Sequence, residues 1–171
     1  LRDAHYRLFG PAKVLVPPRN GDMLDPGKIR AAVLDIHEKN PIEVVVMDMT
    51  DGAETALWLE DVIGCTVIDR SQTVPFKIMD YAKFTSALRE GWLHHTGDPN
   101  LTSHVMNALS RVLPGGDTVF ARPAENRGAA GLQSRRVIDA LVASAMVHTA
   151  ATADLDAEEI EPLYTTSTAV P

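Results

Sequence analysis

The sequence has few of the features that mark secreted, membrane-bound or nucleic-acid-coating proteins. It contains a single cysteine, Cys65, so a disulfide framework is excluded and a reducing compartment is expected. No apolar run approaches the ~20 residues of a membrane span, and the first residues lack the layout of a secretory signal. The formal net charge of −7 argues against a generically basic nucleic-acid-coating protein. We therefore expect a cytoplasmic protein with no membrane partner.

Phosphate-cradling loops and catalytic triads are missing as well. No GxGxxG or GxxxxGKS/T motif occurs, so we expect this chain to bind no nucleotide. Ser71 has no GxSxG context and Cys65 lies in a predicted strand, so neither is an obvious nucleophile. His94, His95 and His104 match no familiar zinc spacing and have no cysteine beside them. We expect these histidines to be satisfied or exposed.

What is present is an alternation of apolar strands and amphipathic helices. This alternation favours a three-layer α/β sandwich with a largely parallel central sheet, whose strands are covered on both faces. The predicted strands are residues 12–18, 42–48, 65–69 and 118–123, and the predicted helices are residues 25–39, 52–63, 75–90, 99–112 and 133–149.

Charge is spread unevenly along a chain whose 171 residues suit one domain. We assign this domain to residues 1–150, and we predict that residues 151–171 form an acidic, flexible tail. The stretch of residues 111–136 is basic instead. Its five arginines are Arg111, Arg122, Arg127, Arg135 and Arg136.

Asp48 and Asp69 each close a predicted parallel strand. In parallel sheets, ligands gather at the carboxyl ends of the strands. A carboxylate at the end of an apolar strand such as residues 42–48 needs a cation, a metal ion or backbone donors. Position alone does not separate a metal-binding role for Asp48 from hydrogen bonding to loop amides.

Asp139 has two explanations of its own. It lies at the edge of the apolar stripe of the predicted helix 133–149, the setting of a ligand aimed into a cleft. Arg135 lies four residues earlier, so an i,i+4 ion pair of about 0.3–0.5 kcal/mol is the alternative. Asp25, Asp51 and Asp98, by contrast, are predicted to be structural helix caps.

Several blocks, in this order, resemble the C-terminal nuclease domain of tailed-phage terminase large subunits, of the type found in actinobacterial phages and prophages. The resemblance covers nearly the whole chain. The blocks are LDPGKIRAAVLDIHEKNPIEVVVMD, VIDRSQ, ALREGWLHHTGDPNLTSHVMNAL, FARPAENRG and RRVIDALVASAMVH.

The resemblance implies a ribonuclease-H-like fold and metal-dependent cutting of concatemeric double-stranded DNA during packaging. It places Asp48 and Asp139 in an acidic cluster that binds two Mg²⁺ or Mn²⁺ ions, with Asp69 a candidate third ligand. The family's partners are a terminase small subunit and a portal protein. The implied phosphate contacts fall on arginines. They are Arg122, Arg127, Arg135 and Arg136.

One departure from the family leaves a second hypothesis open. The family's first catalytic aspartate lies on a first strand upstream of the segment equivalent to residues 12–18, and Asp3 is not in such a strand. We therefore expect a domain that lacks the family's first strand or strands, with an incomplete metal site. The alternative to an active endonuclease is an inactive prophage remnant that retains a DNA-contacting or assembly role.

Overall fold

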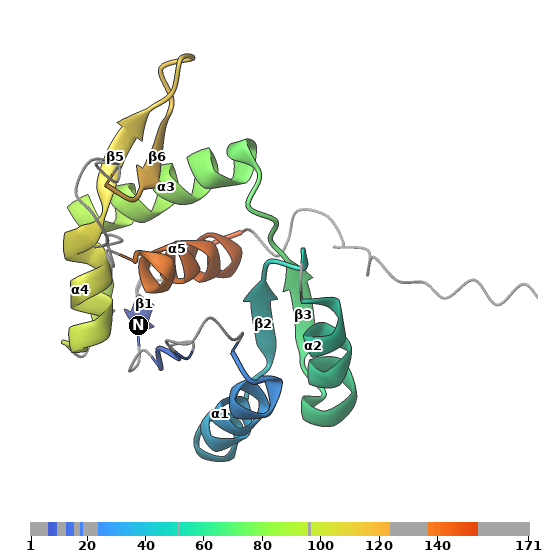
Figure 1. The fold of residues 1–171 in the computed structure, drawn as a ribbon. Coiled ribbons are helices and arrows are strands. Elements are labelled where there is room, and N and C mark those ends of the chain that lie inside the picture. The colour runs from blue at the N-terminus through green and yellow to red at the C-terminus, as the bar shows by residue number, and fades with distance from the viewer. Residues whose placement is uncertain are drawn as a thin grey trace, which may run out of the picture.

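The computed structural model describes residues 7–9, 13–15, 18, 24–50, 52–95, 97–123 and 137–153 (Figure 1). Strands and helices alternate along this part of the chain, which confirms the predicted mixed α/β class. The strands are β1 (Arg7–Phe9), β2 (Val44–Met47), β3 (Thr66–Asp69), β4 (Leu93–His95), β5 (Leu109–Val112) and β6 (Thr118–Ala121). The helices are α1 (Pro26–Lys39), α2 (Ala53–Trp58) with the π-helical turn η1 (Leu59–Ile63), α3 (Val74–Arg89), α4 (Pro99–Asn107) and α5 (Asp139–Ala151).

The described strands form three separate pairs rather than one continuous sheet. β2 and β3 are parallel, and Met47 at the end of β2 lies opposite Asp69 at the end of β3. β1 is parallel to β4, whereas β5 and β6 form an antiparallel hairpin. A three-layer sandwich around one central sheet, and with it the ribonuclease-H-like fold, stays a prediction.

Helix α5 lies at the centre of the described fold, between α3 and β2 (Figure 1). Its residues Leu141 and Ala145 are 2% and 1% exposed, and they pack on Phe84 of α3. Phe120 of β6 completes this cluster, with its ring centroid 6.1 Å from that of Phe84. Because buried apolar surface contributes about 25 cal/mol per Å², this contact ties α5 to α3 and to the hairpin.

Two predicted helix caps are confirmed. Asp25 and Asp98 each accept a hydrogen bond from the backbone N–H two residues later, at 2.8 Å, and each precedes a proline in the first turn. The side-chain oxygen satisfies an amide that the first helical turn leaves without a partner. Asp51, the third predicted cap, lies outside the described residues.

The expectation that the parallel strands are covered on both faces is wrong. No residue of β2 or β3 is buried, and Val44 is 51% exposed. Among the described residues, these two strands have only each other as sheet partners. A two-stranded sheet is too narrow to hold a layer of helices on each face.

The helix predicted over residues 99–112 ends at Asn107, because residues 109–112 form β5. Pairing with β6 supplies the backbone hydrogen bonds that a longer helix would have made, so tertiary structure overrides local propensity. Gly116, at φ 91°, closes the hairpin in a region of backbone conformation that favours glycine.

The last helix begins at Asp139 rather than at residue 133. Val137 and Ile138 are not helical, so the proposed i,i+4 pair between Arg135 and Asp139 cannot form along a helix. Arg135 itself lies outside the described residues. A carboxylate in the first turn of a helix is favoured by the partial positive charge of that end.

Other differences concern short segments. Residues 13–15 form no strand, although they belong to the predicted strand 12–18. Strands β1 and β4 pair where no strand was predicted. On α3 the buried residues are Asp80, Phe84 and Ala87, whereas the apolar side chains of Met79 and Leu88 are exposed.

Helix α5 ends at Ala151, just inside the boundary predicted for the acidic tail, and residues 154–171 of that tail lie outside the described part. The division of the chain at residue 150 therefore stays a prediction. None of the helices in the described ranges is long and apolar enough to cross a membrane.

Removing the Phe84 ring should destabilise the fold strongly, because Phe84 is 5% exposed and contacts both α5 and β6. Phe84→Ala is expected to lower the free energy of unfolding by about 3–5 kcal/mol. Leu88→Ala, one turn later on α3 and 51% exposed, should change it by no more than about 0.5 kcal/mol. Urea denaturation measures both, and equal losses would contradict the described core.

Candidate functional site

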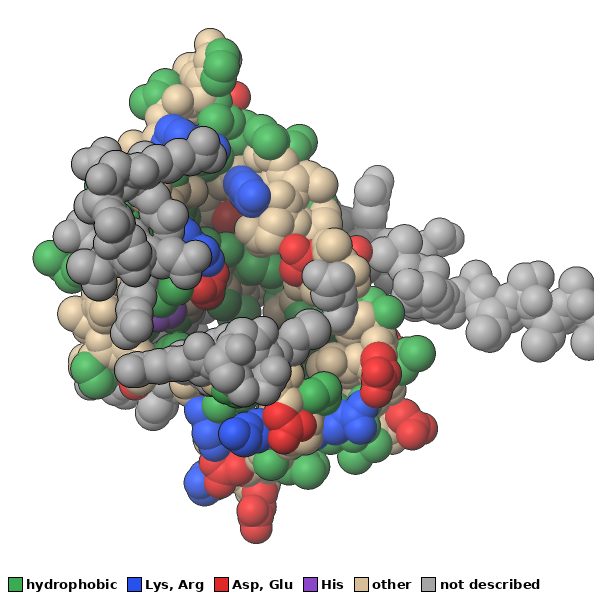
Figure 2. Space-filling view, in the orientation of Figure 1, with side chains coloured by type: hydrophobic (Ala, Val, Ile, Leu, Met, Phe, Trp, Pro, Cys, Tyr) green, Lys and Arg blue, Asp and Glu red, His purple; other side chains and the backbone are tan. Residues whose placement is uncertain are grey.

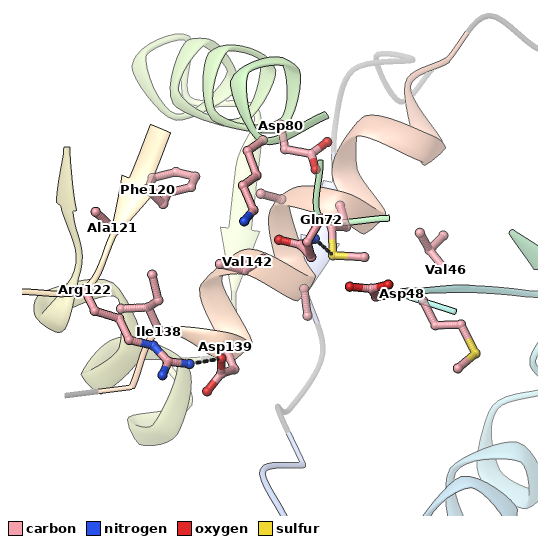
Figure 3. A pocket seen from close by; sticks show the side chains of 15 residues that line it. Val46, Asp48, Gln72, Asp80, Phe120, Ala121, Arg122, Ile138, Asp139 and Val142 are labelled. Atoms are coloured by element: carbon pink, nitrogen blue, oxygen red, sulfur yellow. Dashed lines mark hydrogen bonds and ion pairs between the residues drawn. The ribbon is translucent and has the colours of Figure 1, made fainter. Parts of the chain in front are cut away.

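A cleft of about 530 Å³ opens between α3, α5 and the carboxyl ends of β2 and β6. Figure 2 shows acidic and basic side chains around a hollow in the middle of this face, and Figure 3 shows the side chains that line the cleft. Asp48 and Asp139, far apart in the sequence, both line it, and Figure 3 places them on different sides of it. The other polar side chains that line it are Gln72, Lys77, Asp80 and Arg122.

Asp48 follows the last residue of β2, and Thr50 holds its carboxylate. Its Oδ1 accepts hydrogen bonds from the Thr50 hydroxyl at 2.6 Å and from the Thr50 backbone N–H at 3.0 Å. These two bonds lower the pKa of Asp48. Burial opposes them with a smaller effect, and the Gln72 backbone N–H and the Lys77 ammonium make still smaller contributions that lower the pKa. Asp48 is therefore ionised at neutral pH. The hydrogen bond from the Thr50 backbone N–H is the loop-amide contact that was the alternative to a metal-binding role. The Asp48 side chain nevertheless lines the cleft.

Asp139 is the first residue of α5, and its carboxylate contacts Arg122 across the cleft wall (Figure 3). Arg122 Nη2 donates to Asp139 Oδ1 at 2.5 Å, while the two side chains are 56% and 66% exposed. Exposed pairs of this kind contribute about 0–1 kcal/mol. The pair can therefore open readily when either partner is offered a stronger ligand.

Arg122 follows β6 directly, and it is the one predicted phosphate contact that the described residues include. The other three, Arg127, Arg135 and Arg136, lie outside them. Lys77 of α3 is a second cation in the cleft that sequence reasoning missed, and its ammonium makes no ion pair with any described residue. Helical spacing alone offered no signal for it, because Lys77 faces the cleft only through the packing of α3 on α5.

Asp69 is not brought into the cleft. It ends β3 beside β2, and its Oδ1 accepts a hydrogen bond from the Met49 N–H at 3.4 Å. It is absent from the residues that line the cleft. This bond links Asp69 to the loop that follows β2, and its place as a third ligand stays a prediction.

Asp80 is a buried carboxylate that sequence reasoning missed. It is 4% exposed, and Arg70 donates to it at 2.7 Å. Arg70 also lies over the Phe76 ring, 4.3 Å from its centroid. The spacing Phe76, Asp80, Phe84 along one helix face was the available signal, since it places an acid in the middle of an apolar stripe. The ion pair neutralises Asp80 at the wall of the cleft.

The chemistry of the cleft suits a hard divalent cation, although the described residues hold no group of three His, Cys, Asp or Glu side chains close enough to bind one. Mg²⁺ prefers carboxylate oxygen, keeps several waters, and is commonly held by one or two carboxylates together with substrate phosphates. Asp48 and Asp139 supply two such carboxylates. They fit a hydrated ion that is completed by a phosphate ligand.

The three histidines that matched no zinc spacing have different surroundings. Within the described ranges no metal-binding cluster includes them. The ring of His104 is buried, and its Nδ1 accepts a hydrogen bond from the backbone N–H of Ala140 at 2.8 Å. His95 Nδ1 accepts one from the Gly97 N–H at 3.1 Å. The expectation that His95 and His104 are satisfied structurally is confirmed.

Comparisons with known proteins bear on the fold of this chain. No protein-family model matches the chain, and no curated protein matches it. The structure is similar to the crystal structure of the HK97 bacteriophage large terminase, with a TM-score of 0.56 and 19% sequence identity over 74% of this chain. The match spans 25% of the length of that terminase. At this identity the likeness shows a terminase-like fold.

The contacts of Asp48 predict how its ionisation responds to mutation. Thr50→Val removes the hydroxyl donor and keeps the backbone N–H, so the pKa of Asp48 should rise toward the ordinary value of about 3.9. Thr102→Val removes a hydroxyl that bonds only a backbone carbonyl, and it should leave the Asp48 pKa unchanged. A carboxyl ¹³C NMR titration measures both.

The same contacts fix the sign of a pH effect on stability. Because the pKa of Asp48 is lower in the folded chain than in the unfolded chain, its ionised form stabilises the fold at neutral pH. This stabilisation is lost as the pH falls below the unfolded pKa toward the folded one. An Asp48 pKa at or above its ordinary value in the native chain would contradict the contacts to Thr50.

Proposed function

We propose that this chain is the nuclease domain of a tailed-phage terminase large subunit, which cuts concatemeric double-stranded DNA with Mg²⁺ or Mn²⁺. The observation that carries the proposal is the meeting of Asp48 and Asp139 in one cleft of a terminase-like fold. Both residues come from blocks that resemble the nuclease domain of that family. Two ions in such a site supply a hydroxide nucleophile and stabilise the leaving oxygen of the phosphodiester.

The residues of the cleft have separate tasks in this proposal. Thr50 keeps Asp48 ionised, so a carboxylate ligand is ready at neutral pH. Arg122 leaves Asp139 for a DNA phosphate, which costs little because their pair is exposed. Lys77 of α3 offers a second phosphate contact in the cleft. Contacts of this kind give affinity for the DNA backbone without reading its sequence.

The proposed partners follow from the same assignment. They are double-stranded DNA, a terminase small subunit and a portal protein, whereas nucleotide binding is left to a separate motor. At a net charge of −7, contact with DNA depends on local groups of cations, and Arg122 and Lys77 line this cleft.

A second candidate function is an inactive module that only contacts DNA or assembles with packaging proteins. The observation that favours it is that Arg122 already neutralises Asp139 while no three-residue metal cluster exists among the described residues. This candidate retains DNA binding and predicts no cleavage.

Plasmid cleavage in Mg²⁺ or Mn²⁺ separates the two functions. The native chain should nick or linearise supercoiled plasmid, and EDTA should abolish the reaction. Asp48→Asn and Asp139→Asn should each lower the cleavage rate more than about 100-fold. Even the loss of a residue that only hydrogen-bonds a metal ligand lowers affinity or activity about 10–100-fold.

The matched control is Asp69→Asn, which removes a carboxylate at the end of the neighbouring strand but outside the cleft. Asp69→Asn should cleave plasmid at a rate within about threefold of the native rate. A variant that disturbed the metal site would lower the rate by about 10–100-fold. A folded native chain that binds DNA in a gel-shift assay without cutting it would favour the inactive module. Cleavage that persists in Asp139→Asn would exclude Asp139 from the site.

A further inference from the structure

Two side chains of α4 contact the backbone on either side of Asp139. His104 Nδ1 accepts the Ala140 N–H at 2.8 Å, one residue after Asp139. Asn107 Nδ2 donates to the Val137 carbonyl at 3.2 Å, two residues before it. Because they lie three residues apart on α4, His104 and Asn107 share one helix face. Together they hold the segment that carries the Asp139 side chain.

The start of α5 lacks a cap of its own. Ile138 occupies the capping position, and its apolar side chain cannot accept a hydrogen bond. The first amides of a helix have no partner within the helix, so a buried one needs an acceptor from elsewhere. His104 supplies it, and its ring is only 6% exposed. A hydrogen bond shielded from water in this way is costly to leave unmade.

The contact with Arg122 cannot hold the backbone at Asp139 in this way. It reaches the carboxylate itself, and both of its partners are more than half exposed. In the proposed function that contact opens when DNA or a metal ion binds. The backbone at Asp139 must then be held by groups that keep their hydrogen bonds when DNA or a metal ion binds. The buried His104 side chain meets this requirement.

We infer that His104 is a positioning residue, which fixes the first turn of α5 so that the Asp139 carboxylate meets Asp48 in one divalent-cation site. This inference rests on the proposed function. His104 itself touches neither metal ion nor substrate. Its hydrogen bond to Ala140 sets where the carboxylate lies once Arg122 has moved away.

Metal affinity and stability, measured on the same variants, test the inference. His104→Ala removes the acceptor, whereas His104→Asn keeps an acceptor atom on the γ-carbon, as Nδ1 is in histidine. Leu101→Ala, one turn earlier on α4 and 7% exposed, is the matched control, because it opens the same helix interface without touching α5 backbone amides. Calorimetric Mn²⁺ titration and thermal unfolding are carried out for each chain.

His104→Ala should bind Mn²⁺ roughly 10-fold more weakly than the native chain. This is the size of effect expected when a group that orients a metal ligand is lost. His104→Asn should recover binding to within about threefold of the native chain. Leu101→Ala should lose thermal stability with unchanged Mn²⁺ affinity. If His104→Ala and Leu101→Ala lose stability alike and both bind Mn²⁺ as the native chain does, the inference is overturned.

A metal-free readout separates this inference from the proposed function. The carboxyl ¹³C resonance of Asp139 reports its contact with Arg122, and it should shift in His104→Ala but not in Leu101→Ala. If native Mn²⁺ binding does not depend on Asp48 and Asp139, the proposed function fails. The positioning role of His104 is then decided by this resonance alone, and an unshifted resonance overturns it.

Discussion

The packing of α5 against α3 is the contact on which the rest of the structure depends. Ala145 is 1% exposed, and its small side chain lets α5 approach Phe84 closely. The same helix also contacts β2, and the cleft is lined both by Asp139 at the start of α5 and by Asp48 after the end of β2. Asp139 and Asp48 thereby share a cleft although most of the described fold separates them in sequence (Figure 3). A mutation that disturbed this packing would therefore disrupt the site without changing any residue of the site.

The two carboxylates of the cleft are held in different ways, and this difference suits a site that must exchange ligands. Thr50 stabilises the ionised form of Asp48 through short hydrogen bonds within one loop. Asp139 pairs with an exposed arginine, and side chains of α4 hold the backbone on either side of it. In the proposed function a phosphate would compete for Arg122 and a cation for Asp139, so each ligand would favour the binding of the other by releasing its partner.

Local chemistry determined which features the sequence could predict. The caps Asp25 and Asp98 and the strands β2, β3 and β6 follow from nearby residues, and Asp48 stood out as an acid that ends an apolar run. The start of α5 could not be found this way, because it is set by His104, 36 residues earlier in the chain. Strand β5 was missed for the same reason, since its pairing partner decides its conformation. The contact between Arg122 and Asp139 likewise exists only in the folded chain.

The central claim is that Asp48 and Asp139 form one metal site, and anomalous diffraction from crystals grown with Mn²⁺ tests it most directly. The predicted result is a peak in the cleft whose ion lies about 2–2.5 Å from a carboxylate oxygen of each residue, or a pair of peaks that the two residues share. Arg122 should then have moved off Asp139. Peaks only at other carboxylates, with the Arg122 contact intact at saturating Mn²⁺, would contradict the claim.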